Sequence, residues 1–264
     1  MSRLFYSPTA QLLIEVIPKC GLQTIISTLL QIEGHDLHSL DPKLKVIGKF
    51  SKLCKKYEIF GKDKNDIPKI TVVRNPYSRG LSAFSNKAHR ILRGVSKDSG
   101  VYSYDQFEKF IKTLRKNTER TSQQMNSSVE QWSVWAGQDK SNLSSPRAMA
   151  GSAINTDHHF MPITRQISNI EKYDRVFCLE DIDSFYEYLN SRAAEISPAR
   201  GKIQFIRKPL NVSGSISKYI SYLTSEYQLF YMNYYGDDFR ILGYSTDIKD
   251  ILRPATISKG KYYE

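Results

Sequence analysis

Two strand-turn-helix units, at residues 12–32 and 69–93, constrain the fold of this chain more than any other feature. Each begins with a short run rich in branched apolar residues, at 12–17 and 69–73, which is typical of a buried strand. A loop follows each run, and a helical pattern follows each loop. Successive units of this kind normally build a parallel sheet with crossover helices, so the sequence predicts an α/β fold.

Further elements follow the same reasoning. A third strand is predicted at 173–179, and helices are predicted at 104–116, 182–194 and 216–235. The last of these carries many aromatic residues at helical spacing, which indicates a core-facing helix rather than a stacking platform for nucleic acid.

The length of 264 residues suits one domain, and we expect residues 1–264 to form it. Residues 117–156 are rich in Ser, Asn, Gln and Thr, and we interpret them as a mobile insertion or lid. Trp132 and Trp135 within this stretch indicate that part of it packs.

The charge balance is basic, with 38 Lys and Arg against 27 Asp and Glu, a formal charge of +11. Such a surface attracts anions without choosing among nucleotides, nucleic acid, membranes and acidic sugars. The three cysteines are odd in number and lack a CxxC pair, which argues against a disulfide framework or a zinc site. With no long apolar run and no leader pattern, we expect a cytoplasmic protein without a transmembrane segment.

The loop after the first strand has the parts of a phosphate site. It reads Pro18, Lys19, Cys20, Gly21, Leu22, Gln23 and Thr24. A loop between a strand and a helix N-terminus offers backbone N–H donors, here with a cation at Lys19 and a hydroxyl at Thr24. A Walker P-loop is absent, and an ordinary turn with a surface lysine is the alternative.

A second anion site is predicted where the second strand ends. Arg74 stands at that strand end, and Ser82 lies farther along the helix that follows. An arginine can grip a phosphate with two hydrogen bonds, and a hydroxyl adds another donor. A nucleotide that carries phosphates at both ends would need two such sites at neighbouring strand ends.

The pair of motifs resembles the sulfotransferases that use PAPS (3′-phosphoadenosine 5′-phosphosulfate), specifically the carbohydrate (Golgi-type) branch. The family's Pro-Lys-x-Gly-x-Thr-like loop is matched here by Pro18, Lys19, Gly21 and Thr24. Its Val-Arg-Asp-Pro-x-x-Arg-Leu-x-Ser pattern is matched by Val73, Arg74, Pro76, Arg79, Leu81 and Ser82. Three later stretches, at 157–162, 173–181 and 235–244, are similar to the family's His-Trp-x-Pro, Tyr-Asp-x-Val-x-x-x-Glu and Tyr-x-x-Asp-Phe-x-x-x-Gly-Tyr motifs.

The resemblance implies a P-loop-like three-layer fold, with a central parallel β-sheet flanked by helices. It implies PAPS as the sulfuryl donor, no metal, and a hydroxyl-bearing glycan or glycolipid as acceptor rather than nucleic acid. Lys19 and the backbone from Cys20 to Thr24 would hold the 5′-phosphosulfate, and Arg74 and Ser82 would hold the 3′-phosphate. Gln23 departs from the family's usual Thr. The phosphate loop begins only about 18 residues into the sequence, so we expect no membrane anchor of the family's kind here, which indicates either a soluble bacterial-like member or a shortened chain.

The general base is not fixed by the sequence. His159 is the leading candidate because imidazole titrates near neutral pH and because it lies in a family-like motif; a structural histidine is the alternative. His35, His38 and His89 are weaker candidates. Glu15 could pair with Lys19 or act as the base, but we expect a carboxylate that faces solvent.

Three other functions stay open at this stage. A P-loop small-molecule kinase would bind ATP with Mg²⁺, although the Walker motif is absent. A nucleic-acid-binding protein is the second alternative, and the basic net charge is its sole support. A catalytically inactive relative would keep the fold and bind a partner. The acceptor and the oligomeric state are not indicated by the sequence.

Overall fold

The computed structural model describes residues 3–35, 55–59, 66–90, 92, 101–116, 158–167, 170–198, 201, 203, 205 and 214–256. The predicted insertion or lid at 117–156 lies outside these residues, as does His38.

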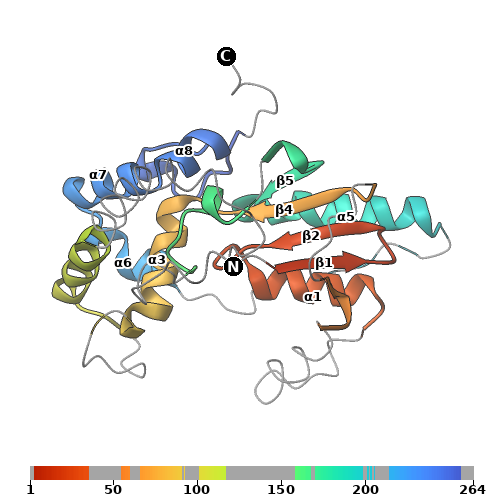
Figure 1. The fold of residues 1–264 in the computed structure, drawn as a ribbon, viewed down its shortest axis with the longest axis horizontal. Helices are drawn as coiled ribbons and strands as arrows, with labels where there is room; N and C mark the ends of the chain where they lie inside the picture. The colour runs from red at the N-terminus through yellow and green to blue at the C-terminus, as the bar shows by residue number, and fades with distance from the viewer. Residues whose placement is uncertain are drawn as a thin grey trace, which may run out of the picture.

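A five-stranded sheet with the order β3-β1-β2-β4-β5 forms the centre of the fold (Figure 1). Its strands are β1 (Arg3–Ser7), β2 (Leu12–Val16), β3 (Glu58–Ile59), β4 (Lys69–Val73) and β5 (Arg175–Cys178). The three strands predicted from the sequence, β2, β4 and β5, pair in parallel, so the α/β fold is confirmed. The central parallel sheet flanked by helices is thus as predicted, and β1 adds a strand that runs antiparallel to both β2 and β3.

Helices α1 (Leu22–Ile32) and α5 (Ile182–Ile196) cover one face of the sheet. Successive side chains of a strand point to opposite faces. The alternate residues Leu12, Ile14 and Val16 of β2 therefore share one side, where they form one buried cluster with both helices.

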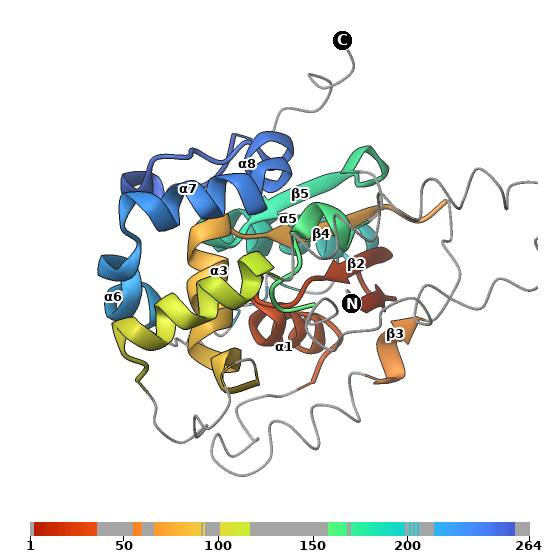
Figure 2. The ribbon, with the colours of Figure 1, turned by 60° about the vertical axis from the view of Figure 1, so that its left-hand side comes forward.

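A second cluster of helices lies at the end of the sheet toward which β2 and β4 point (Figure 1). It contains a helix at 104–116 together with α3 (Pro76–Lys87), α6 (Ser215–Tyr219), α7 (Ser225–Tyr234) and α8 (Gly236–Leu242). The helix at 104–116 lies beside α3 (Figure 2). The ring of Phe84 on α3 is central, with aromatic neighbours at centroid distances of 5.0–5.1 Å from residues 102, 107, 110 and 219.

The helix predicted at 216–235 is interrupted. After α6 a 3₁₀ turn intervenes at Ile220–Tyr222, and α7 begins after Thr224. The aromatic residues still face the core, since Tyr219, Tyr227 and Tyr231 are buried, which confirms the packing role predicted for them. Further 3₁₀ turns are at Ala88–Arg90, Ile163–Arg165, Ile170–Lys172, Leu179–Asp181 and Ile248–Asp250.

The segment at 243–256 folds back against the sheet. The Ala255 amide donates to the Cys178 sulfur at the end of β5, over 3.3 Å. The Tyr77 hydroxyl on α3 donates to the Thr246 carbonyl, over 3.0 Å. These contacts tie the segment to both β5 and α3. None of the helices in the described ranges combines the length and the apolar character that crossing a bilayer would require.

Candidate functional site

The loop at 17–21 turns sharply from β2 into α1. The Cys20 amide donates to the Ile17 carbonyl over 3.1 Å, and both Lys19 (φ 69°) and Gly21 (φ 78°) adopt left-handed backbone conformations. For a lysine this conformation costs about 1–2 kcal/mol. Strained backbone positions of this kind cluster at binding sites, although ordinary turns also contain them.

Gly21 caps α1 without a side chain. No side-chain hydrogen bond caps this helix, and its first turn holds no acidic residue. The N-terminus of a helix carries unsatisfied N–H donors and a partial positive charge. A Cβ at position 21 would lie 2.6 Å from Leu179 Cδ1, so a larger residue would also crowd the end of β5.

The other side chains of the loop and of the first turn of α1 differ in how far they are buried. Cys20 is fully buried, and burial raises the pKa of its thiol to about 12, so it enters the site only through its backbone. Leu22 packs against the α1–α5 cluster. Gln23 and Thr24 are half-buried in the first turn of α1, as is Lys19 in the loop before it.

Arg74 meets this loop directly. Its Nε donates to the Ser78 hydroxyl over 2.8 Å, and its Nη1 donates to the Lys19 carbonyl over 3.3 Å. Burial lowers the pKa of Arg74, but a guanidinium remains charged at neutral pH. Within the described part of the chain, Nη2 has no hydrogen-bond partner. The contact arises because β2 and β4 are parallel neighbours whose carboxyl ends meet at one edge of the sheet.

Ser82 lies on α3, the helix that follows Arg74. It is buried, and its carbonyl accepts from Asn86 Nδ2 over 2.9 Å, but its hydroxyl has no partner among the described residues. No hydrogen bond joins Ser82 to Arg74 in this part of the chain. Asn75, which caps α3, accepts from the Tyr77 and Ser78 amides.

Arg79 is a residue to which the sequence assigned no role. Its side chain is fully buried, with Nε donating to the Pro18 carbonyl over 3.2 Å and Nη2 to the His158 carbonyl over 3.4 Å. Its Nη1 has no partner in the described ranges. A charged residue two positions after Tyr77 and two before Leu81, on a helix that is mostly buried, is the sequence signal that could have identified it.

His159 is placed near the loop by this arginine. One guanidinium holds both the Pro18 carbonyl, next to Lys19, and the His158 carbonyl, next to His159. The rings of His158 and His159 lie 4.2 Å apart between centroids.

The chain around His159 is anchored by the motif at 235–244. The Tyr235 hydroxyl donates to the Phe160 carbonyl over 2.9 Å. The buried carboxylate of Asp238 accepts from the Ile163 and Thr164 amides, over 2.7 and 2.8 Å. Burial raises the pKa of Asp238, and the positive charge of Arg79 opposes that shift.

Glu180 is a second residue to which the sequence assigned no role, although it lies in the family-like stretch at 173–181. Its Oε1 accepts from the Asn75 amide and the Ser78 hydroxyl, over 3.0 and 3.3 Å, and its Oε2 accepts from the Tyr244 hydroxyl over 3.0 Å. Burial raises the pKa of Glu180, while its hydrogen bonds and the charge of Arg74 lower it. The carboxylate therefore lies directly behind the turn that carries Arg74.

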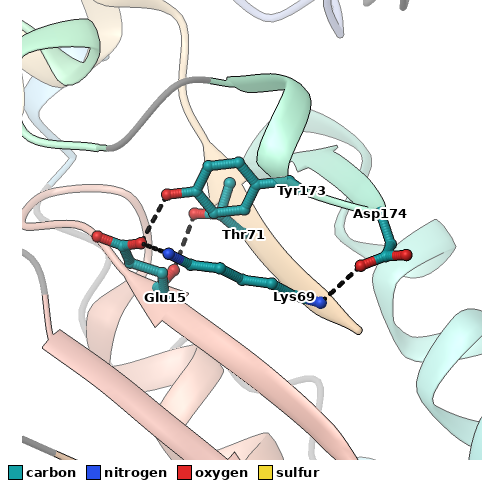
Figure 3. A network of polar contacts seen from close by, with 5 residues as sticks. All are labelled: Glu15, Lys69, Thr71, Tyr173 and Asp174. Atoms are coloured by element: carbon teal, nitrogen blue, oxygen red, sulfur yellow. Dashed lines mark hydrogen bonds and ion pairs between the residues drawn. The ribbon is translucent and has the colours of Figure 1, made fainter. Parts of the chain in front are cut away.

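Two interpretations of Glu15, a carboxylate that faces solvent and a partner of Lys19, are corrected. Its carboxylate is buried, 2.9 Å from Lys69 Nζ, and accepts from the Tyr173 hydroxyl over 2.6 Å (Figure 3). The ammonium of Lys69 also lies 4.9 Å from the centre of the Tyr173 ring. Glu15 thus joins β2, β4 and the chain before β5, and neither faces solvent nor pairs with Lys19. The sequence did not reveal this because the partners come from distant segments.

The weaker histidine candidates lie elsewhere. His35 follows α1, and its Nε2 lies 2.9 Å from the Tyr57 hydroxyl. His89 lies in the 3₁₀ turn after α3. The described residues contain no group of three or more His, Cys, Asp or Glu arranged to hold a metal ion.

The arrangement combines an uncapped helix start, a lysine beside it and the half-buried Arg74, whose Nη2 has no hydrogen-bond partner in the described ranges. All three features favour an anion with several oxygens. Glu180, whose charge acts on Arg74, has both carboxylate oxygens occupied by other donors.

Comparison with known proteins agrees with this chemistry. The model of the Sulfotransferase family matches residues 2–245, which spans the loop, both arginines, His159 and the motif at 235–244. No curated protein and no solved structure gives a significant match. Since the family match covers most of the 264 residues, the chain belongs to the sulfotransferase family.

Proposed function

We propose that the protein transfers a sulfuryl group from PAPS to a hydroxyl of a carbohydrate or glycolipid and releases PAP, the desulfated nucleotide. The observation that carries the proposal is the contact between Arg74 Nη1 and the Lys19 carbonyl, which joins two cationic strand ends at the uncapped start of α1. One doubly phosphorylated nucleotide could occupy both. PAPS would supply an activated sulfuryl group on its 5′-phosphate.

The first residues of α1 suit the 5′-phosphosulfate. The backbone N–H groups from Gly21 to Thr24 would bind its oxygens, and Lys19 would stabilise negative charge at the bridging oxygen of the leaving group. Positioning and charge stabilisation of this kind supply most of the catalysis in the related transfer of phosphoryl groups.

Arg74 and Ser82 suit the 3′-phosphate. Support comes from the unpartnered Nη2 of Arg74 and the unpartnered hydroxyl of Ser82 among the described residues. Both groups donate hydrogen bonds, and phosphate oxygens only accept them at neutral pH.

His159 is the proposed base that takes the proton of the acceptor hydroxyl. Its support is the guanidinium of Arg79, which holds the neighbouring His158 carbonyl against the loop of Lys19. The formal charge of +11 favours an acidic glycan or glycolipid as acceptor. The family match favours sulfuryl transfer over the kinase alternative.

Calorimetry with PAP tests the proposal. We expect micromolar binding by the wild type and a loss of about tenfold to a hundredfold in Arg74→Ala, the range of 1.5–3 kcal/mol for hydrogen bonds to charged groups. Arg240→Ala is the matched control, because this arginine is exposed and its one ion-pair partner among the described residues is Asp237 on its own helix. Failure of the wild type to bind PAP would remove the proposal.

Transfer itself needs a second measurement, with radiolabelled sulfate in the PAPS and a panel of glycans and glycolipids. We expect Lys19→Ala to abolish transfer, and unchanged turnover in this variant would contradict the role given to Lys19. A catalytically inactive relative is the second candidate, favoured by Gln23 in place of the family's Thr. It would bind PAP and transfer sulfate to no acceptor.

A further inference from the structure

Behind Arg74 runs a chain of hydrogen bonds that the proposed chemistry does not use. Arg74 Nε donates to the Ser78 hydroxyl over 2.8 Å, and that hydroxyl lies 3.3 Å from Glu180 Oε1. At the far end, the Tyr244 hydroxyl donates to Glu180 Oε2 over 3.0 Å. The chain therefore connects the turn after β4, the end of β5 and the segment after α8.

The direction of these hydrogen bonds is set by Glu180. An ionised carboxylate can only accept, and a serine hydroxyl has a single hydrogen to donate. The Ser78 hydrogen is drawn toward Glu180 Oε1 or toward the Asn75 carbonyl, 3.1 Å away. The lone pairs of the Ser78 oxygen then face Arg74 Nε and accept its hydrogen. Ser78 thus holds the guanidinium at Nε, while Nη1 contacts the Lys19 carbonyl of the loop.

Glu180 acts on Arg74 through Ser78 rather than as its ion partner. No ion pair joins the two charged groups within the described residues. A carboxylate bonded directly to Nη1 or Nη2 would compete with an incoming anion for the same N–H donors. The indirect arrangement fixes the plane of the guanidinium and keeps Nη2 open.

We propose that Glu180, held by Tyr244, is a positioning residue that orients the guanidinium of Arg74 through Ser78 for the 3′-phosphate. The proposal makes two claims that are measured separately. The first is that Glu180 orients the Arg74 guanidinium in the protein without nucleotide. The second, that this orientation strengthens nucleotide binding, rests on the proposed function.

The orientation is tested by NMR without any nucleotide. The Nε–H signal of Arg74, assigned by its loss in Arg74→Lys, should exchange slowly with water in the wild type. It should exchange at least tenfold faster in Glu180→Ala and in Ser78→Ala, because each removes a link of the chain. It should stay slow in Glu180→Gln, because the amide oxygen can take the place of Oε1 and accept from the Asn75 amide and the Ser78 hydroxyl, while its N–H₂ can donate to the Tyr244 hydroxyl oxygen. Equal exchange in the wild type and in a folded Ser78→Ala would overturn the proposal, even if Glu180→Ala fails to fold.

The consequence is tested by calorimetry with PAP. We expect about tenfold weaker binding in Glu180→Ala and Ser78→Ala, close to the factor that one hydrogen bond contributes. Glu180→Gln should bind within about threefold of the wild type, on the same scale. The matched tyrosine pair is Tyr244→Phe, which removes the donor to Glu180, and Tyr77→Phe, which removes a donor to Thr246 on the other side of the turn. Only Tyr244→Phe should weaken binding.

Each outcome decides one part. Tighter PAP binding in both Glu180→Ala and Glu180→Gln would show that Glu180 acts as an opposing charge, which overturns the positioning role. Faster Nε–H exchange with unchanged PAP affinity would overturn its consequence for the nucleotide. If the wild type does not bind PAP, the proposed function fails, and the exchange measurement still decides whether Glu180 orients Arg74.

Discussion

Gly80 should not tolerate even one added methyl group, and the structure allows the cost to be worked out. It lies in the middle of α3, against the ring of Tyr231 on α7. A Cβ at this position would lie 2.3 Å from Tyr231 Cε1 and 2.7 Å from its hydroxyl oxygen. Carbon atoms in contact normally lie about 3.5–4.0 Å apart, so the ring or the helix must move by more than about 1 Å.

Two effects oppose each other in Gly80→Ala. Alanine favours a helix over glycine by about 1 kcal/mol. Overpacking a well-filled core costs about 1–3 kcal/mol, and the fully enclosed Tyr231 places this site at the upper end. We expect a net loss of about 1–2 kcal/mol in the free energy of unfolding, which lowers the melting temperature by about 2–8 °C.

Thermal and urea unfolding measure this, with Gly236→Ala as the matched control. In the part of the chain that the structure describes, no atom of another segment lies within 4 Å of a Cβ built at Gly236, so the same substitution should there be neutral or slightly stabilising. In a Tyr231→Leu background, Gly80→Ala should cost less than it does alone, since the clashing ring is gone. A Gly80→Ala variant as stable as Gly236→Ala would refute the reasoning.

Three further predictions concern the site. Asp238→Asn should lower the free energy of unfolding by about 2–3 kcal/mol in urea titrations. In the wild type the Ile163 and Thr164 amides both donate to the carboxylate, and in the variant one of these N–H groups would face the asparagine N–H₂. A loss below about 0.5 kcal/mol would contradict this. Gly21→Ala should cost about 1–2 kcal/mol in the same assay, because its φ of 78° is unfavourable for alanine, and an unchanged midpoint would show that the loop adapts. Burial raises the pKa of Glu180 above its ordinary 4.5, so the folded protein favours the protonated carboxyl. The contribution of this group to the free energy of unfolding therefore falls as pH rises from 4.5 through the raised pKa. The difference in unfolding free energy between the wild type and Glu180→Gln should decline over that range, and a flat or rising difference would oppose the burial argument.

The elements that set the frame of the site were predictable from local patterns. The strand at 69–73 was predicted with the bounds that the structure has, and the helix at 104–116 is present, because branched runs and helical periodicity are read within a few residues. The antiparallel strand β1 was missed, since a five-residue strand with three half-buried positions and no regular apolar alternation gives a weak signal.

The supports of the site were not predictable in this way. Arg79 contacts a carbonyl 61 residues away in sequence, and Glu180 accepts from an amide 105 residues away. Their residue types fit a surface as well as a core, and only the tertiary arrangement pairs them. Glu15 was misplaced for the same reason, because its partner Tyr173 lies 158 residues away.

The folding back of residues 243–256 has a consequence for the biosynthesis of this protein. Tyr77, three positions after Arg74, is secured by a carbonyl 169 residues farther along the chain. A nascent chain thus exposes its loop and Arg74 long before Tyr244 and Thr246 emerge from the ribosome to hold the turn from behind. Ribosome-bound chains that stop short of these residues would therefore lack the contacts of Tyr244 and Thr246 behind this turn, even where the sheet had already formed.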